Sequence, residues 1–387
     1  MSQVKNIFVY SGASMSNIWA KRFCLHKFTK TGFNIIFLDA ARIFHSEIEI
    51  KKRASGAYNF LYSPSNTQRI ASFTELKHIV KGLNGSDIVW VANRNKLNTN
   101  FQNHDIKIFN KYNIKYFTGQ GFLLPKVKPN IKLYDKYYFL KNRLNYNIEL
   151  VNYKIKNIPL KPSFVIGSGN VGREQAMEKI PRMGNYVSLP SLNILWDQVA
   201  LILNEKYIVY VDEAANFSPD AMLFGNISPV KSPENFHCNM NYLFNKIENW
   251  MGLPIIISAS GKHDYKDNPF NDRKIIYGKT QELIQHSSMV IGHKSSGLDQ
   301  AIIERKPVLQ VMDEEFIDLK NHQIKEMAEN LFNQNAFWLH EIDRNTLNCI
   351  QKIDETYLQQ VEYDYFREQG LTGDFFKNLN NYLSQLN

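Results

Sequence analysis

Cysteine is scarce in this sequence, and its spacing argues against two structural classes. Only three cysteines occur among 387 residues, at Cys24, Cys238 and Cys349. No two of them are separated by two residues, the spacing typical of zinc and redox sites, and so few scattered cysteines predict no disulfide framework. Because disulfides are rare in reducing compartments, the composition favours a cytoplasmic protein.

Long apolar runs are also missing. No stretch of the sequence reaches the roughly 18 apolar residues that a membrane-spanning helix needs. The opening residues, MSQVKNIFVYSGAS, lack the charged region and long apolar core of a secretory signal. We therefore expect a cytoplasmic protein without a membrane span, and peripheral contact with the inner face of an anionic membrane stays open.

Acidic residues are in deficit. The chain has 46 Lys and Arg against 37 Asp and Glu, a net charge of +9. Such a balance suits an anionic partner, which can be nucleic acid, lipid or substrate. The basic residues are dispersed and no RNA-binding or DNA-binding module is recognisable, so we predict no nucleic-acid partner and keep a nucleic-acid-binding protein as the non-enzymatic alternative. The basic, tyrosine-rich segment 126–143 is expected at the surface, as a solvated face or against anionic lipid or glycan.

What the sequence does contain is a steady alternation of short apolar runs and helical patterns. This alternation predicts an α/β fold with parallel sheets covered by helices on both faces. In the first half, strands are predicted at 6–10, 34–38, 87–91, 114–118 and 163–166, and helices at 17–28, 73–82 and 101–112. In the second half, strands are predicted at 207–211, 254–259, 289–291 and 307–311, and helices at 236–251, 278–286, 298–304, 321–332 and 350–369.

The strand pattern starts again at residue 206, after a helix predicted within 190–204. We take this restart as a domain boundary. The prediction is two Rossmann-like domains, 1–195 and 196–370, facing each other across a cleft, with a C-terminal helix in 371–387 that packs back on the first domain. Ligands of such sheets bind beyond the carboxyl ends of the strands, so the cleft is the expected site.

One glycine motif imitates a dinucleotide fingerprint. Residues 167–172, GSGNVG, follow a predicted strand and precede a predicted helix. The NAD fingerprint also requires an acidic residue at the end of the next strand, and the next apolar run, NYVSL, has none. We interpret the motif as a glycine turn at the interdomain cleft.

The stretch 278–311 predicts a βαβ unit. Its first strand leads into the turn KSSG and its helix leads into the strand PVLQV. Ser295, Ser296 and Gly297 thus stand where the free N–H groups of a helix N-terminus attract phosphate. The alternative is that Ser295 or Ser296 only caps the helix.

Polar residues follow three predicted strands of the second half. They are Asp212 and Glu213; Lys262, His263 and Asp264; and His293, Lys294, Ser295 and Ser296. A carboxylate can deprotonate an acceptor hydroxyl, a cationic group can stabilise a departing phosphate, and hydroxyls with backbone N–H groups can bind that phosphate, which are three needs of glycosyl transfer. The alternatives are a capped or salt-bridged loop at Asp212 and Glu213, a surface role for His263 and a structural hydrogen bond at His293.

At these residues the sequence resembles bacterial GT-B glycosyltransferases that build surface polysaccharides, most closely the sialyltransferase-like and Kdo-transferase-like enzymes. The resemblance covers roughly 207–311 and includes GKTQELIQHSSMVIGHKSS and KPV. It implies that Asp212 and Glu213 are the acidic motif, that His263 acts catalytically near the donor phosphate, and that a paired-serine motif holds the phosphate. The donor-binding residues it implies are Lys262, Gly278, Lys279, Thr280, His293, Ser295, Ser296 and Gly297.

The resemblance implies an inverting transferase that needs neither a metal nor a cofactor. It would move a nonulosonic acid from a CMP-sugar to a cell-surface glycan or glycolipid. Gly12, Ser14, Gly119 and Gln120 are candidates for the acceptor side, and a first-domain residue near them is the base if Asp212 and Glu213 are not. The alternatives are a UDP-sugar-dependent GT-B glycosyltransferase and a UDP-sugar 2-epimerase.

Overall fold

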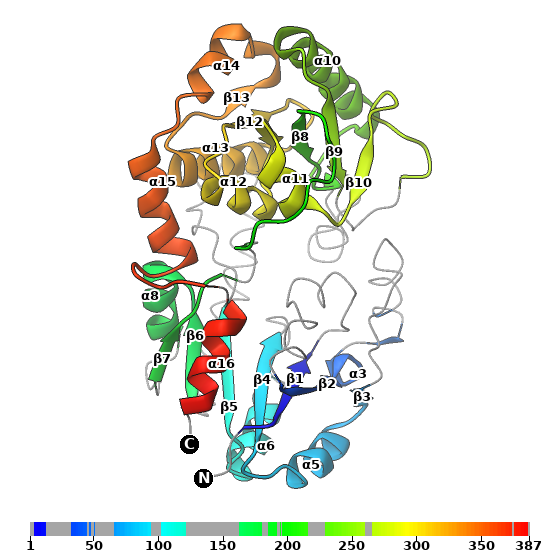
Figure 1. The fold of residues 1–387 in the computed structure, drawn as a ribbon. Helices are drawn as coiled ribbons and strands as arrows, with labels where there is room; N and C mark the ends of the chain where they lie inside the picture. The colour runs from blue at the N-terminus through cyan, green and yellow to red at the C-terminus, as the bar shows by residue number, and fades with distance from the viewer. Residues whose placement is uncertain are drawn as a thin grey trace.

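The chain forms two parallel sheets, one from each half of the sequence (Figure 1). This computed structural model describes residues 4–12, 32–44, 46, 47, 50, 66–93, 102–120, 162–179, 185–191, 194, 196–215, 229–259, 265–373 and 375–385. The predicted helix 17–28, the basic segment 126–143, and Ser14, Lys262 and His263 lie outside the described residues. The predicted α/β class with parallel sheets is confirmed.

The first sheet has seven parallel strands in the order β3-β2-β1-β4-β5-β6-β7. Its strands are β1 (Asn6–Ser11), β2 (Asn34–Asp39), β3 (Thr67–Arg69), β4 (Asp87–Asn93), β5 (Tyr116–Gln120), β6 (Phe164–Gly167) and β7 (Asn185–Ser188). Its helices are α3 (Ala41–Phe44), α5 (Phe73–Lys81), α6 (Gln102–Lys111) and α8 (Gly169–Lys179). The short polar strand β3 was not predicted, because TQR lacks the apolar residues that identify a strand.

Apolar side chains cover both faces of the first sheet. On one face α5 and α6 bury Leu76, Val80 and Phe109 against the strands. The other face is covered from the far end of the chain by α16 (Phe375–Gln385), which buries Phe376 and Leu379 against it. The C-terminal helix therefore belongs to the core of the first half, and Figure 1 shows it in red beside β5 and β6.

The second sheet has six parallel strands in the order β10-β9-β8-β11-β12-β13. Its strands are β8 (Ile208–Val211), β9 (Ile255–Ala259), β10 (Ile275–Tyr277), β11 (Met289–Gly292), β12 (Val308–Met312) and β13 (Phe337–Trp338). Its larger helices are α10 (Pro233–Met251) and α13 (Asp318–Phe332), followed by α14 (Arg344–Ile350) and α15 (Glu355–Val361). The predicted βαβ unit is present, since β11 pairs in parallel with β12.

Two short helices follow strands at the carboxyl edge of the second sheet. Helix α11 (Thr280–His286) follows β10, and the 3-10 helix η2 (Ser296–Leu298) with α12 (Asp299–Ile303) follows β11. Both lie along the border of the second half that is nearer the first (Figure 1). The predicted helix 278–286 starts two residues later than expected, because Gly278 has a left-handed φ of 65° that ends the preceding strand in a turn.

The helix predicted within 190–204 is wrong. Its described residues 196–204 are not helical, and they pass along the second half as a connecting segment. The Val199 N–H donates to Gln285 Oε1 at 3.0 Å, and its carbonyl contacts His286 Nε2 at 2.9 Å. These tertiary hydrogen bonds satisfy the backbone groups of Val199 in place of helical ones.

A second connection crosses between the halves near the C-terminus. Helix α15 continues into the π-helix η4 (Glu362–Phe366), which contacts α8 of the first half. The predicted single helix 350–369 is therefore divided, because Asp354 caps a new helix by accepting from the Tyr357 N–H. Within the residues the structure describes, no helix is long and apolar enough to cross a membrane.

The two connections are tied to each other. The Ser191 N–H donates to the Phe366 carbonyl at 2.7 Å, and the Arg367 guanidinium lies 4.9 Å from the centre of the Trp196 ring. Glu362 is buried and binds both Arg305, at 2.7 Å, and Arg367. We call Trp196, Arg305, Glu362 and Arg367 the crossing cluster.

The GSGNVG motif serves this crossing. Gly169 begins α8 with a φ of 63°, and a Cβ on it would overlap the Asp364 carbonyl and lie 2.7 Å from the Tyr365 nitrogen. The glycine lets the η4 backbone approach α8 closely. This packing role accounts for the glycine without a dinucleotide.

Candidate functional site

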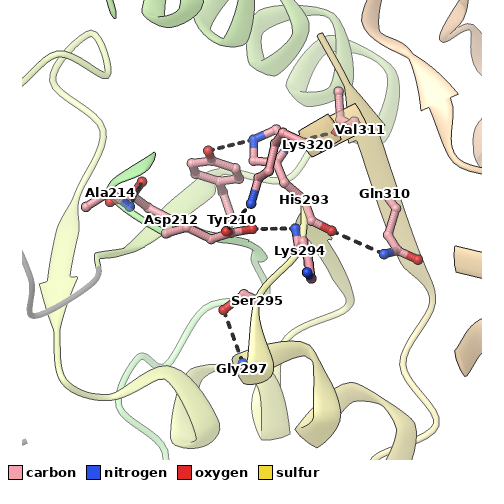
Figure 2. Close-up of polar contacts among 11 residues, drawn as sticks. Tyr210, Asp212, Ala214, His293, Lys294, Ser295, Gly297, Gln310, Val311 and Lys320 are labelled. Atoms are coloured by element: carbon pink, nitrogen blue, oxygen red, sulfur yellow. Dashed lines mark hydrogen bonds and ion pairs between the residues drawn. The ribbon is translucent and has the colours of Figure 1, made fainter. Parts of the chain in front are cut away.

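The candidate site lies at the carboxyl edge of the second sheet, where the residues that follow β8, β11 and β12 meet. Figure 2 shows Tyr210, Asp212, His293, Lys294 and Lys320 at this edge. Parallel strands present their carboxyl ends to one edge, which is why residues separated by more than 80 positions come together there.

Asp212 is a buried carboxylate that shapes the loop after β8. Its Oδ1 accepts from the Ala214 N–H at 2.9 Å, and its Oδ2 accepts from the Tyr265 hydroxyl at 2.9 Å. Ala214 has a φ of 48°, a left-handed conformation that the turn across Asp212 stabilises. Burial, and then the charge of Asp212, raise the pKa of Tyr265, so this hydroxyl stays protonated as a donor.

Glu213 joins three elements. Its Oε1 accepts from the Lys294 N–H, just after β11, and its Oε2 pairs with Lys320 Nζ in the first turn of α13 at 2.5 Å. Burial lowers the pKa of Lys294, and the nearby positive charge of Lys320 adds to this effect. The predicted acidic pair is therefore engaged by internal donors on each of its four oxygens.

His293 is fixed inside the second half. Its Nδ1 lies 2.7 Å from the Val311 carbonyl, which can only accept, so Nδ1 carries the proton. Its Nε2 therefore accepts from the Tyr210 hydroxyl at 3.0 Å. Burial lowers the pKa of His293 to about 4, which keeps the ring neutral at ordinary pH. Both ring nitrogens have internal partners, which fits the structural role considered from the sequence, and the donor-binding role of His293 stays a prediction.

The serine turn has the capping geometry. The Gly297 N–H donates to Ser295 Oγ at 3.1 Å at the start of η2. A Cβ on Gly297 would lie 2.9 Å from Thr280 Cγ2 and 3.3 Å from Val211 Cγ1, so the turn packs tightly between α11 and β8. The Ser258 hydroxyl of β9 donates to Thr280 Oγ1 at 2.9 Å. Thr280, Ser295 and Gly297 are thus brought together, as a phosphate-binding surface requires.

The remaining predicted residues are more dispersed. Lys279 is half exposed and pairs with Glu282 at 3.1 Å. Ser296 is partly buried and follows Ser295 in η2. In the first half, Gly12 follows β1, and Gly119 and Gln120 end β5. They lie at the carboxyl ends of two strands that both pair with β4. Ser14, Lys262 and His263 are outside the described residues.

Sequence reasoning missed Tyr265 and Lys320. Tyr265 is the second residue after His263 in the sequence, and Lys320 lies in the first turn of a helix after β12. The helix predicted over 321–332 begins three residues later than α13, so Lys320 fell outside the predicted helix. Among the described residues there is no group of three or more His, Cys, Asp or Glu side chains that could hold a metal ion.

Two parallel α/β sheets joined by two crossings, with the C-terminal helix returned to the first sheet, define a GT-B fold of two Rossmann-like domains. The structure of UDP-GlcNAc 2-epimerase from Methanocaldococcus jannaschii is similar, with a TM-score of 0.50 and 10% identity over 98% of this chain and 99% of that chain. MurG from Acinetobacter baumannii matches with a TM-score of 0.46 and 7% identity over 99% and 100% of the two chains. MnaA from S. aureus, in a co-structure with UDP, matches with a TM-score of 0.45 and 13% identity over 98% and 97%. No protein-family profile and no curated protein sequence matches the chain.

Proposed function

We propose that the protein is an enzyme acting on a nucleotide sugar, and that it is a UDP-sugar-dependent glycosyltransferase. The observation that carries this proposal is the meeting of Thr280, Ser295 and Gly297 at the carboxyl edge of the second sheet. Ser295 Oγ accepts from the Gly297 N–H and Thr280 Oγ1 accepts from Ser258, so both hydroxyl protons can serve as neutral donors to a diphosphate. The likeness in fold to an epimerase of UDP-GlcNAc favours UDP over the CMP expected from the sequence resemblance.

In this proposal the residues of the second half bind the donor. Ser296 and Lys279 extend the surface made by Thr280, Ser295 and Gly297, with Gly278 allowing the turn before α11. Lys262 and His263 keep their predicted roles beside the donor phosphate. The glycan or glycolipid acceptor is assigned to the first half, near Gly12, Ser14, Gly119 and Gln120.

The catalytic base is assigned to the first half as well. The carboxylate oxygens of Asp212 and Glu213 all accept from internal donors. We therefore assign the base to a residue of the first half near Gly12, Ser14, Gly119 and Gln120. In the inverting reaction the base would remove the proton of an acceptor hydroxyl as that oxygen attacks the anomeric carbon, and UDP would depart. No metal or cofactor is part of the proposal, and a cytoplasmic enzyme at the inner face of a membrane remains the expected setting.

A UDP-sugar 2-epimerase is the second candidate, because an epimerase has the fold likeness with a TM-score of 0.50. An epimerase needs no separate acceptor, whereas a transferase does. The purified protein is incubated with UDP-GlcNAc, with and without a glycan acceptor mixture, and the products are followed by NMR. Acceptor-dependent release of UDP supports the transferase. Formation of the 2-epimer without an acceptor supports the epimerase and contradicts the transferase.

A further inference from the structure

We propose that Glu213 and Lys320 are positioning residues that hold the turn 294–297 in its binding shape, and that Glu213 is not the catalytic base. The proposal concerns the nucleotide-binding surface and rests on the proposed function for its ligand. It assigns to Lys320 a role that the sequence did not predict.

The first step is the occupancy of the Glu213 carboxylate. One oxygen accepts from the Lys294 N–H and the other is paired with Lys320 at 2.5 Å. The side chains of Glu213 and Lys320 are only 15% and 11% exposed. A base must reach the proton it removes at hydrogen-bond distance, and both oxygens of Glu213 are directed to fixed internal donors.

The second step concerns the Lys294 N–H, which needs a hydrogen-bond acceptor outside the sheet. Strand β11 ends at Gly292, so this N–H is beyond the ladder that satisfies the strand. Glu213 supplies its acceptor across from β8, and a charged acceptor makes a stronger hydrogen bond than a neutral one. The backbone of Lys294 is thereby fixed directly before Ser295.

The third step concerns the two residues that flank Lys294, each of which is held by its own hydrogen bonds. His293 is held by Tyr210 and Val311, and Ser295 caps Gly297. Lys294 lies between these two fixed points, and its N–H bond to Glu213 completes the series (Figure 2). Lys320 in turn holds Glu213 from α13 and lies 5.9 Å from the centre of the Phe316 ring.

The test compares Glu213→Ala, Glu213→Gln and Lys320→Met with wild type, using titration calorimetry with UDP. Glutamine keeps an acceptor for the Lys294 N–H, whereas alanine does not. We expect Glu213→Ala to weaken UDP affinity about tenfold or more, and Glu213→Gln to retain most of it. Combining Glu213→Ala with Lys320→Met should weaken binding no further than Glu213→Ala alone, since the two residues act as one unit. Lys325→Met, which removes an exposed pair on the same helix, is the matched control and should change nothing.

A second readout separates this inference from the proposed function. Hydrogen exchange of the segment 289–298 is measured without nucleotide, and Glu213→Ala should speed exchange in the turn while Lys325→Met does not. Unchanged exchange in Glu213→Ala overturns the inference whether or not UDP binds.

If Glu213→Ala fails to fold, Lys320→Met and Glu213→Gln carry the same test, with faster exchange expected in Lys320→Met. Failure of wild type to bind UDP, with faster exchange in the variants, contradicts the proposed ligand and supports the positioning role. A loss of turnover of 100-fold or more in Glu213→Gln with unchanged UDP affinity would show that Glu213 is the base.

Discussion

At the scale of single residues, the structure depends on residues held in one protonation state or one backbone conformation. His293 is neutral because its ring is buried and because its two nitrogens have one donor and one acceptor as partners. Gly169 is required because a backbone from the other half of the molecule lies against it. Both constraints can be tested by substitution.

The first prediction concerns pH. His293 has a pKa of about 4 in the folded chain and near 6.5 in the unfolded chain, so the unfolded chain takes up the proton first as the pH falls. The contribution of His293 to the free energy of unfolding is fully present above pH 6.5 and declines between pH 6.5 and 4. Below pH 4 the whole contribution, about 3 kcal/mol, is lost. Urea unfolding at several pH values should show a smaller decline in His293→Gln than in wild type. His340→Gln, at a 60% exposed side chain, should keep the wild-type dependence, and an equal decline in all three proteins would contradict this account.

The second prediction compares two glycines with nearly equal φ. Gly169 and Gly252 have φ of 63° and 64°, but a Cβ on Gly252 would meet nothing within 4 Å. Gly252→Ala should therefore cost only the conformational term, about 1 kcal/mol in the free energy of unfolding. Gly169→Ala should cost roughly 3 kcal/mol or more, because the η4 backbone must also move away from α8. Equal losses of unfolding free energy for Gly169→Ala and Gly252→Ala, measured by thermal unfolding, would show that the Asp364 backbone leaves room for a Cβ at residue 169.

At the scale of elements, the positions of the strands follow from the sequence far better than the crossings do. Buried apolar runs such as IVYV and MVIG are predicted to within one or two residues, because interior parallel strands have few alternatives. Short edge strands such as β13, with two residues, give no readable signal. The segment after residue 190 was predicted as a helix from its apolar spacing, yet its described residues are not helical and Val199 bonds to Gln285 and His286 instead.

The third prediction concerns the crossing cluster. Glu362→Gln removes a buried charge that two arginines share, leaving Arg305 and Arg367 without their partner. Because the arginines are partly exposed, we expect a loss of about 2 kcal/mol, less than for a fully buried pair. Glu329→Gln, in an exposed pair with Lys325 at 3.8 Å, is the control and should change stability by less than about 0.5 kcal/mol. Similar urea midpoints for the two variants would argue against the cluster as a stabilising contact.

At the scale of the whole molecule, two sheets of seven and six strands are joined at two crossings, and the C-terminal helix packs on the first sheet. The doubled α/β pattern was readable from the sequence because each half repeats the alternation of strand and helix. Among the candidate residues, the meeting of Thr280, Ser295 and Gly297 could be anticipated, since strand ends of a parallel sheet share one edge. The partners of Asp212 and Glu213 could not, because Tyr265 and Lys320 come from loops and helices whose position no local pattern specifies.

The most direct test of the central claim is calorimetric titration of the purified protein with UDP, CMP and GDP at one salt concentration. The account predicts saturable binding of UDP with a stoichiometry near one, and weaker binding of the other two nucleotides. Gly297→Val, which places a side chain against Thr280 and Val211, should abolish that binding while Gly252→Ala retains it. Absence of binding by all three nucleotides to the folded wild-type protein would contradict the account.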